Sequence, residues 1–245
     1  MPIKTLFVDD EKSLLDQTEI FLEKRDEEIE VLTASSAERA LEMMEEEDFD
    51  VIVSDYQMPD IDGLEFLEET REERGDDIPF IMFTGKGREK VAMKALNLGA
   101  DRYIQKGGDP KSQYGVLART IKQEYEHFQS EKKYRTVVKN SHDAIYIYRG
   151  DEFLFVNDRA VEITGYSREE LTDMKIWELL HPDDRQRVRN IGEKRTEGDD
   201  APSEYNVRLI TKEGKTKYLH LTVTPIDFKG QRAFLGSARD ITELK

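Results

Sequence analysis

The first half of the chain alternates short runs of apolar and β-branched residues with longer amphipathic segments, and this order repeats five times. The apolar runs predict strands and the amphipathic segments predict helices. The predicted strands are Ile3–Val8, Glu30–Ala34, Val51–Ser54, Phe80–Phe83 and Arg102–Gln105. The predicted helices cover 12–25, 36–47, 64–74, 88–98 and 111 onward. Strands this apolar need cover on both faces, so we expect a five-stranded parallel sheet between helices, a doubly wound α/β domain.

From about Ser141 the pattern changes to turn-bounded strands with a helical region between them. The predicted strands are Ala144–Tyr148, Phe153–Val156, Tyr205–Ile210, Tyr218–Pro225 and Ala233–Arg239. Gly214 and Gly230 mark hairpin turns between the last three strands. Short helices are predicted over 159–164, 168–171, 176–180 and 183–197. This order predicts an α+β domain with a five-stranded antiparallel sheet.

The segment that joins the two halves has neither glycine nor proline over 25 residues, from Val116 to Asn140. It predicts one continuous helix, about 37 Å long at roughly 1.5 Å per residue. Its apolar stripe is broken by Lys132 and Arg135, which leaves two interpretations open: a coiled-coil dimer and an exposed connector. We therefore predict a first domain at 1–125, a connecting helix at 126–140 and a second domain at 141–245.

Composition narrows the class of protein. Residues 1–125 hold 31 acidic against 16 basic side chains, whereas residues 126–245 hold 22 against 21. An acidic surface repels phosphate backbones, so we expect no direct contact with nucleic acid. The absence of cysteine excludes disulfides, thiolate catalysis and cysteine-ligated metals. The apolar runs are much shorter than the roughly 20 residues that cross a bilayer, and the first residues lack a signal-peptide pattern. We therefore expect a cytoplasmic protein without a membrane span.

Four predicted strand ends in the first half carry polar side chains suited to phosphoryl chemistry. Asp9 and Asp10 follow the first strand, Asp55 follows the third, Thr84 the fourth and Lys106 the fifth. In a doubly wound sheet of order 2-1-3-4-5, ligands bind at the carboxyl ends of the strands, beside the switch point. Converging carboxylates repel each other unless a cation lies among them, and oxygen ligands favour Mg²⁺. With the Lys106 ammonium and the Thr84 hydroxyl, such a site can hold a phosphoryl group.

These residues lie in motifs that resemble the receiver domain of response regulators in two-component signalling. The motifs are Val8-Asp9-Asp10-Glu11, Asp55-Tyr56-Gln57-Met58-Pro59-Asp60-Ile61-Asp62-Gly63, Phe83-Thr84-Gly85 and Tyr103-Ile104-Gln105-Lys106. Their order and spacing match the family over the whole first half. The resemblance implies a flavodoxin-like domain that takes part in a phosphorelay.

The resemblance also implies an acceptor and a metal site. Asp55 would accept a phosphoryl group from the phosphohistidine of a sensor histidine kinase or phosphotransfer protein. Mg²⁺ would be bound by Asp10, by Asp55 and by the backbone carbonyl of Gln57. Asp9 would assist through a water molecule.

A second group of residues would respond to the phosphoryl group. Thr84 would move to bind it, Tyr103 would swing inward behind Thr84, and Lys106 would pair with a phosphoryl oxygen. The chain departs from the family directly after Lys106, where Gly107-Gly108 replaces the usual proline. The loop into the last helix of this domain is therefore expected to be built differently.

The second half resembles a PAS domain of the sensory-box kind. The motifs are Asn140-Ser141-His142-Asp143-Ala144-Ile145, Phe155-Val156-Asn157, Thr164-Gly165-Tyr166-Ser167-Arg168-Glu169-Glu170-Leu171, Leu180-His181-Pro182-Asp183-Asp184-Arg185 and Arg239-Asp240-Ile241-Thr242-Glu243. Some PAS domains hold a cofactor or metabolite between sheet and helices. A flavin adduct needs a cysteine, which this chain lacks, so that chemistry is excluded.

The ligand of the second half stays unknown at this point. An axial haem ligand would have to be His142, His181 or His220, and we expect each to be a surface or structural residue, so we expect no haem. His127 lacks the neighbouring Glu and Pro of a kinase phosphoacceptor site. Five aromatic side chains could line a pocket or simply pack the core: Tyr146, Tyr148, Phe153, Phe155 and Trp177.

We therefore predict a response regulator in which phosphorylation of Asp55 acts through the connecting helix on a PAS sensor or docking module. No ATP lid, Walker loop, cyclase signature or recognition helix is found in the sequence, so we expect no dedicated catalytic domain. A homodimer through the connecting helix and the PAS domain is compatible with the pattern. Two alternatives stay open: the N-terminal part of a hybrid histidine kinase, and a phosphate-independent PAS ligand-binding protein.

Overall fold

The computed structural model describes residues 1–23, 26–73, 77–85, 89–198 and 200–244. The chain divides into two compact units, residues 1–132 and 133–245. Among the residues described, no helix combines the length and the apolar character needed to cross a bilayer.

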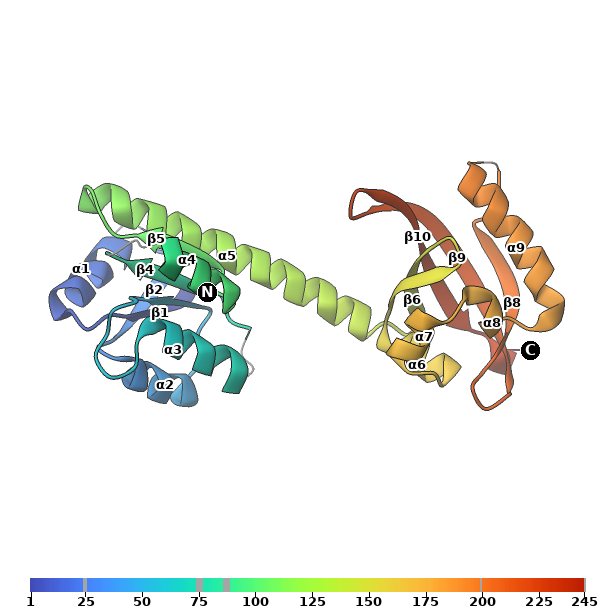
Figure 1. The fold of residues 1–245 in the computed structure, drawn as a ribbon, viewed down its shortest axis with the longest axis horizontal. Coiled ribbons are helices and arrows are strands. Elements are labelled where there is room, and N and C mark those ends of the chain that lie inside the picture. The colour runs from blue at the N-terminus through green and yellow to red at the C-terminus, as the bar shows by residue number, and fades with distance from the viewer. Residues whose placement is uncertain (24–25, 74–76, 86–88, 199, 245) are drawn as a thin grey trace. The chain divides into compact units, whose positions relative to one another are not determined.

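The first unit is a parallel sheet of five strands in the order β2-β1-β3-β4-β5, with helices on both faces (Figure 1). The strands are β1 (Ile3–Val8), β2 (Ile29–Ala34), β3 (Val51–Ser54), β4 (Phe80–Thr84) and β5 (Arg102–Gln105). The helices are α1 (Lys12–Glu23), α2 (Ala37–Glu46), α3 (Gly63–Glu68) with the π-helical turn η1 (Glu69–Glu73), α4 (Glu89–Asn97) and α5 (Pro110–Lys139). The predicted doubly wound fold is confirmed, and so is its strand order.

Alternate residues of the strands form two separate cores, one on each face of the sheet. Leu6 and Ile52 pack with α2, α3 and α4, whereas Phe7 and Val53 pack with α1 and α5. All four side chains are buried because successive side chains of a strand point to opposite faces and both faces are covered. The sheet therefore holds its polar strand ends on a rigid support.

Helix boundaries follow capping side chains more closely than apolar periodicity. The predicted helix 36–47 begins one residue later, because Ser36 is the N-cap and its hydroxyl accepts a hydrogen bond from the Arg39 N–H. The predicted helix 64–74 begins at Gly63, where Asp62 and Glu65 form a capping box. The predicted ends at residues 25, 74 and 88 lie outside the described residues.

The helix predicted from residue 111 onward is continuous with the predicted junction helix, and it ends one residue sooner than expected. The structure has α5 over Pro110–Lys139, whereas the glycine-free and proline-free stretch runs over 116–140. Proline is well tolerated in the first helical position, and the Asp109 carboxylate accepts a hydrogen bond from the Ser112 N–H. The boundary between the two compact units falls within α5, after Lys132. The division into 1–125, 126–140 and 141–245 stays a prediction.

The second unit is an antiparallel sheet of five strands in the order β7-β6-β10-β9-β8, covered by short helices (Figure 1). The strands are β6 (Ala144–Arg149), β7 (Glu152–Val156), β8 (Glu204–Ile210), β9 (Thr216–Phe228) and β10 (Gln231–Asp240). The helices are α6 (Asp158–Thr164), α7 (Arg168–Asp173), α8 (Ile176–Leu179) and α9 (Pro182–Glu197), and a 3-10 turn η2 covers Thr242–Leu244. The predicted α+β architecture is confirmed.

Strand β9 is longer than predicted and does not stop at Pro225. It pairs with β10 as far as Phe228, opposite Gln231. The two-residue turn between them is Lys229-Gly230, with φ of 55° and 72°. Positive φ at both positions gives the turn a twist that matches the paired strands, so the hairpin extends to its tip.

Candidate functional site

Three predicted site residues meet at the carboxyl edge of the parallel sheet. Asp9 follows β1, Asp55 follows β3 and Lys106 follows β5. The Lys106 Nζ atom lies 2.5 Å from Asp9 Oδ2 and 2.8 Å from Asp55 Oδ1. One ammonium group therefore bridges carboxylates from two neighbouring strands.

Backbone N–H groups hold the other oxygen of each carboxylate. Asp9 Oδ1 accepts a hydrogen bond from the Glu11 N–H at 3.0 Å, and Asp55 Oδ2 accepts one from the Gln57 N–H at 2.8 Å. Each aspartate thus bonds to the backbone two residues ahead, as in an Asx-turn. The local chain fixes both side chains before any ligand arrives.

Burial strengthens the electrostatic interactions between the charged groups of this cluster. Asp9 is 1% exposed and Asp55 is 7% exposed. Burial raises the pKa of Asp9, and the neighbouring Lys106 opposes that rise. Burial also disfavours the charged form of Lys106, but hydrogen bonds with Asp55 and Asp9 outweigh it and raise the pKa of Lys106. Two carboxylates around one ammonium leave one negative charge uncompensated, which favours a cation.

Thr84 and Tyr103 lie beside this cluster. Thr84 is the last residue of β4 and is buried, and its carbonyl accepts a hydrogen bond from the Lys106 N–H at 2.7 Å. Tyr103 pairs with Met82 in the sheet and is half-buried against the core on the α2, α3 and α4 side. Burial raises the pKa of the Tyr103 hydroxyl, and the charge of Asp55 adds to that rise. The inward movement of Tyr103 stays a prediction.

The proposed metal ligands are only partly assembled. Asp10 is exposed, and across the described ranges no cluster of three or more acidic or histidine side chains is placed to bind a metal ion. The structure brings Asp9 and Asp55 together but does not bring Asp10 to Lys106. The hard oxygen donors and the surplus negative charge nevertheless suit Mg²⁺. The metal roles of Asp10 and of the Gln57 carbonyl stay predictions.

The loop after Asp55 depends on a glycine whose role the sequence did not reveal. A Cβ atom on Gly63 would lie 2.1 Å from the Asp55 carbonyl oxygen, which is far too close. The Gly63 N–H also donates to the Tyr56 carbonyl at 2.9 Å. The first turn of α3 therefore packs directly on the loop that follows Asp55. The position of Gly63 at the end of the Asp55 motif was the available signal.

The loop after Lys106, where the chain departs from the family pattern, turns on a glycine. Gly108 has φ of 86°, in the left-handed region that favours glycine. The Gly107 N–H donates to Gln113 Oε1 at 2.8 Å, which ties the loop to the first turns of α5. Glycine thus supplies the conformation that leads from the site into this helix.

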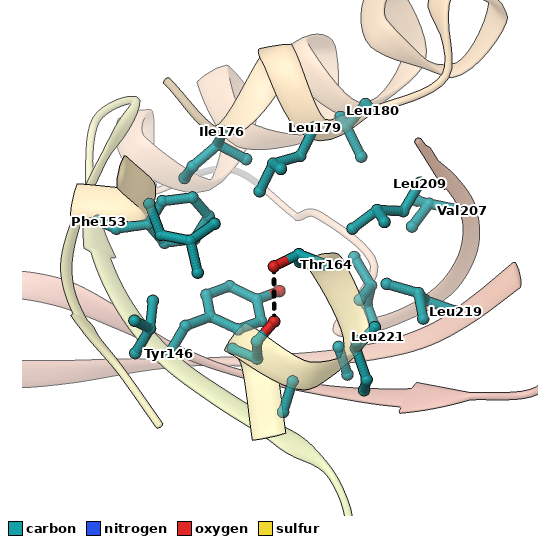
Figure 2. Close-up of a pocket in the computed structure, with 16 residues that line it drawn as sticks. Tyr146, Phe153, Thr164, Ile176, Leu179, Leu180, Val207, Leu209, Leu219 and Leu221 are labelled. Carbon is teal, nitrogen blue, oxygen red and sulfur yellow. Dashed lines mark hydrogen bonds between the residues drawn. The ribbon is translucent and has the colours of Figure 1, made fainter. Parts of the chain in front are cut away.

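The second unit contains an apolar cavity of about 70 Å³ between the sheet and the helices α6 to α8 (Figure 2). Tyr146, Phe153 and Leu221 are among the side chains that point into it. Thr164 also lines it, and its hydroxyl donates to the Ala160 carbonyl at 2.7 Å. Of the five aromatic residues considered for a pocket, Tyr146 and Phe153 line this cavity, and both also pack in the core of the domain.

The histidines lie elsewhere. His181 is the N-cap of α9, His220 bonds to Asn206 Oδ1 at 2.8 Å, and His127 and His142 are exposed. None of them lines the cavity in the part of the chain that the structure describes.

The chain thus combines an α/β domain that has an acidic site at its strand ends with an α+β domain that has an apolar cavity. Family models match the response regulator receiver domain over residues 5–114 and the PAS fold over residues 132–241. The chain therefore consists of a response-regulator receiver domain followed by a PAS domain.

Individual relatives match one domain at a time. The response regulator SaeR of Staphylococcus aureus is 35% identical over 106 residues, 43% of this chain and 45% of that protein. The chain thus covers less than half the length of this relative. A CheY-like receiver domain protein from Methanospirillum hungatei is 31% identical with a TM-score of 0.45, over 52% of this chain and 99% of that one. The PAS domain of an HTR-like protein from Haloarcula marismortui is 21% identical with a TM-score of 0.42, over 49% and 98%.

Proposed function

We propose that the chain is the phosphoacceptor of a two-component phosphorelay. Asp55 takes a phosphoryl group from the phosphohistidine of a sensor histidine kinase or phosphotransfer protein. The observation that supports this most directly is the Lys106 ammonium between Asp9 and Asp55, at 2.5 and 2.8 Å. A positive charge beside the Asp55 carboxylate, at the edge of the sheet where ligands bind, supports Asp55 as the nucleophile.

The transfer requires a nucleophile and groups that neutralise the phosphoryl oxygens. An Asp55 carboxylate oxygen forms the new P–O bond while the P–N bond to the donor imidazole breaks, and the imidazole leaves with a proton. Bound Mg²⁺, held by Asp10, Asp55 and the Gln57 carbonyl, would supply positive charge to the phosphoryl oxygens. Lys106 releases the Asp55 carboxylate and pairs with a phosphoryl oxygen. The Thr84 hydroxyl donates to another.

Phosphorylation changes the charge at the site, and this change drives the proposed signal. A phosphorylated aspartate carries roughly two negative charges where one stood. Lys106 and Thr84 then gain a stronger partner, and the segment 107–109 connects Lys106 to the start of α5. A shift from 1:99 to 99:1 between two states needs about 5.5 kcal/mol, which a few charge-assisted hydrogen bonds supply. The PAS domain acts as the sensor or docking module of the chain.

The proposal is tested by phosphorylation of the full chain with acetyl phosphate and Mg²⁺, resolved on a phosphate-affinity gel. We expect one shifted band in the wild type and none in Asp55→Asn. Asp50→Asn is the matched control, because Asp50 directly precedes β3 at its other end and binds the Lys4 N–H at 2.9 Å. Labelling that persists in Asp55→Asn, or that disappears in Asp50→Asn, would contradict the assignment of the acceptor.

Isothermal titration separates this proposal from a phosphate-independent PAS protein. The phosphorelay requires beryllofluoride to bind in the presence of Mg²⁺, and binding must be lost in Asp55→Asn. Metal binding without any dependence on beryllofluoride would instead favour a simple cation site. The hybrid-kinase alternative predicts the same binding, and the complete gene sequence distinguishes it.

A further inference from the structure

Arg195 is a buried cation in the PAS domain whose side-chain hydrogen bonds go to neutral groups. It lies on α9 and is 7% exposed. Its Nη1 donates to the Tyr148 hydroxyl at 3.0 Å, and its Nη2 donates to the Pro202 carbonyl at 2.6 Å. The rings of Tyr205 and Phe234 lie 5.8 and 5.9 Å from its Cζ atom. No carboxylate of the described residues forms an ion pair with it.

Asp184, the other buried charged side chain among the described residues of this domain, forms an ion pair. Asp184 accepts two side-chain hydrogen bonds from Arg208, each at 3.1 Å, and one from the Arg208 N–H at 2.8 Å. Burial of a charge without an opposite charge costs free energy. Arg195 lacks such an opposite charge among the described residues, so we expect an anionic ligand beside it. Burial disfavours its charged form, yet contacts with the Tyr148 and Tyr205 hydroxyls raise the pKa of Arg195, and the charge persists.

Arg195 faces an enclosed space that adjoins the apolar cavity of Figure 2. A second cavity of about 40 Å³ is lined by Arg195, Tyr148 and Tyr205. It shares Tyr146 and Leu221 with the apolar cavity of about 70 Å³. The two neighbouring cavities therefore differ in their lining, which is apolar in the larger one and includes Arg195 in the smaller one.

Tyr146 lines both cavities and is partly buried. Its ring points into the cavity in Figure 2, and burial raises the pKa of its hydroxyl. Among the described residues, no fully buried side-chain nitrogen or oxygen lacks a hydrogen-bond partner, and no such bond is recorded for Tyr146, so its hydroxyl reaches the open space of the cavity. A Cβ atom on Gly236 would lie 2.2 Å from the ring, so the ring rests on the backbone of β10 and cannot sink further. The hydroxyl is therefore available to a group that enters the cavity.

A surface cleft lies next to the cavity that Arg195 lines. An open cleft of about 490 Å³ lies on the surface of the domain and is lined by Trp177, Gly192 and Arg189. Trp177 and Gly192 also line the smaller internal cavity.

We propose that this PAS domain binds a small apolar monocarboxylate, with its carboxylate on Arg195 and its hydrocarbon body in the apolar cavity. The planar guanidinium matches a carboxylate through two parallel hydrogen bonds, and part of its five N–H groups is left for them. The Tyr146 hydroxyl donates to the same carboxylate. An engineered cavity of about 150 Å³ holds benzene, so the smaller space here suits an acid of a few carbon atoms. This inference rests on the proposed sensor role of the domain and not on phosphoryl transfer at Asp55.

The test is a titration of the full chain with isovalerate, a branched monocarboxylate, by calorimetry without Mg²⁺ or phosphodonor. Fluorescence of Trp177, the single tryptophan, provides a second readout because it lines the cavity. We expect isovalerate to bind at least tenfold more tightly than isovaleramide, which has the same shape without the charge. We also expect isovalerate to bind more tightly than inorganic phosphate. Equal binding of acid and amide, stronger binding of phosphate, or no binding of isovalerate would overturn the proposal.

Variants test whether Arg195 is the residue that binds the carboxylate of isovalerate. We expect Arg195→Met to weaken isovalerate binding at least tenfold, whereas Lys194→Met, which removes an exposed charge from the next position of α9, leaves it unchanged. Unchanged binding in Arg195→Met would refute the assignment. If that variant does not fold, the comparison of acid with amide on the wild type still decides. Asp55→Asn must bind isovalerate like the wild type, so failure of the phosphorelay proposal is distinguishable from failure of this one.

Discussion

Replacement of Lys106 by methionine is expected to destabilise the receiver domain strongly, because two buried carboxylates then lose the cation that they share. Asp9 is 1% exposed and Asp55 is 7% exposed, so water cannot replace the ammonium. Removal of one partner from a buried ion pair typically costs about 3 to 5 kcal/mol of stability. At a urea m-value of about 2 kcal/mol/M, the midpoint of receiver unfolding falls by about 1.5 to 2.5 M.

The loss of stability in Lys106→Met should become smaller as the pH falls. Burial already raises the pKa of Asp9, and removal of Lys106 raises it further, since Lys106 is the group that opposes the shift. A raised pKa means that the folded state binds the proton more tightly than the unfolded state does. The deficit of Lys106→Met is therefore complete above the folded pKa of Asp9. It shrinks as the pH falls toward the unfolded value of about 3.9.

The assay is urea denaturation of the full chain, followed by far-UV circular dichroism at pH 7 and pH 5. The single tryptophan, Trp177, lies in the PAS domain, so its fluorescence reports the unfolding of that domain separately. Lys4→Met is the matched control, because Lys4 pairs with Glu47 where both side chains are partly exposed, and we expect a much smaller loss. A Lys106→Met midpoint equal to that of the wild type at pH 7, or a deficit that grows at pH 5, would refute the reasoning.

Three further outcomes are expected. Gly63→Ala should abolish labelling by acetyl phosphate and lower the receiver melting temperature, because its Cβ atom would lie 2.1 Å from the Asp55 carbonyl oxygen; normal labelling would contradict this. Asn157→Ala should destabilise the PAS domain by about 1 to 3 kcal/mol in urea, because two backbone carbonyls and two backbone N–H groups lose their partner; an unchanged Trp177 midpoint would show otherwise. Hydrogen bonds from Arg208 lower the pKa of Asp184, so its charge should stabilise the PAS domain at pH values above the unfolded pKa. That stabilisation is lost as the pH falls through the folded pKa. The stabilities of Asp184→Asn and the wild type should therefore become equal in acid.

Much of the receiver site could be predicted because its residues lie directly after strands. The alternation of apolar and amphipathic segments determines the strands, and right-handed crossovers bring their carboxyl ends to one edge. Asp9, Asp55 and Lys106 therefore had to be near one another, whatever the details of packing. The same reasoning could not separate Asp9 from Asp10, which are adjacent in the chain. Only the structure shows that Asp9 turns inward to Lys106 while Asp10 stays exposed.

In the PAS domain, the sequence predicts the secondary structure but not the residue that carries the buried positive charge. Its strands and helices follow from turn residues and periodicity, but nothing in the charged sequence of α9 distinguishes Arg195 from the cations around it. Its burial depends on Tyr148, Pro202, Tyr205 and Phe234, which lie on other segments.

The sequence by itself determined the two folds, their order and the edge of the sheet that carries the acidic residues, because these depend on local periodicity and chain handedness. The tertiary structure alone decided which carboxylate meets the lysine, which glycine must lack a side chain and which arginine is buried. These depend on contacts between segments far apart in the chain, which no local pattern encodes.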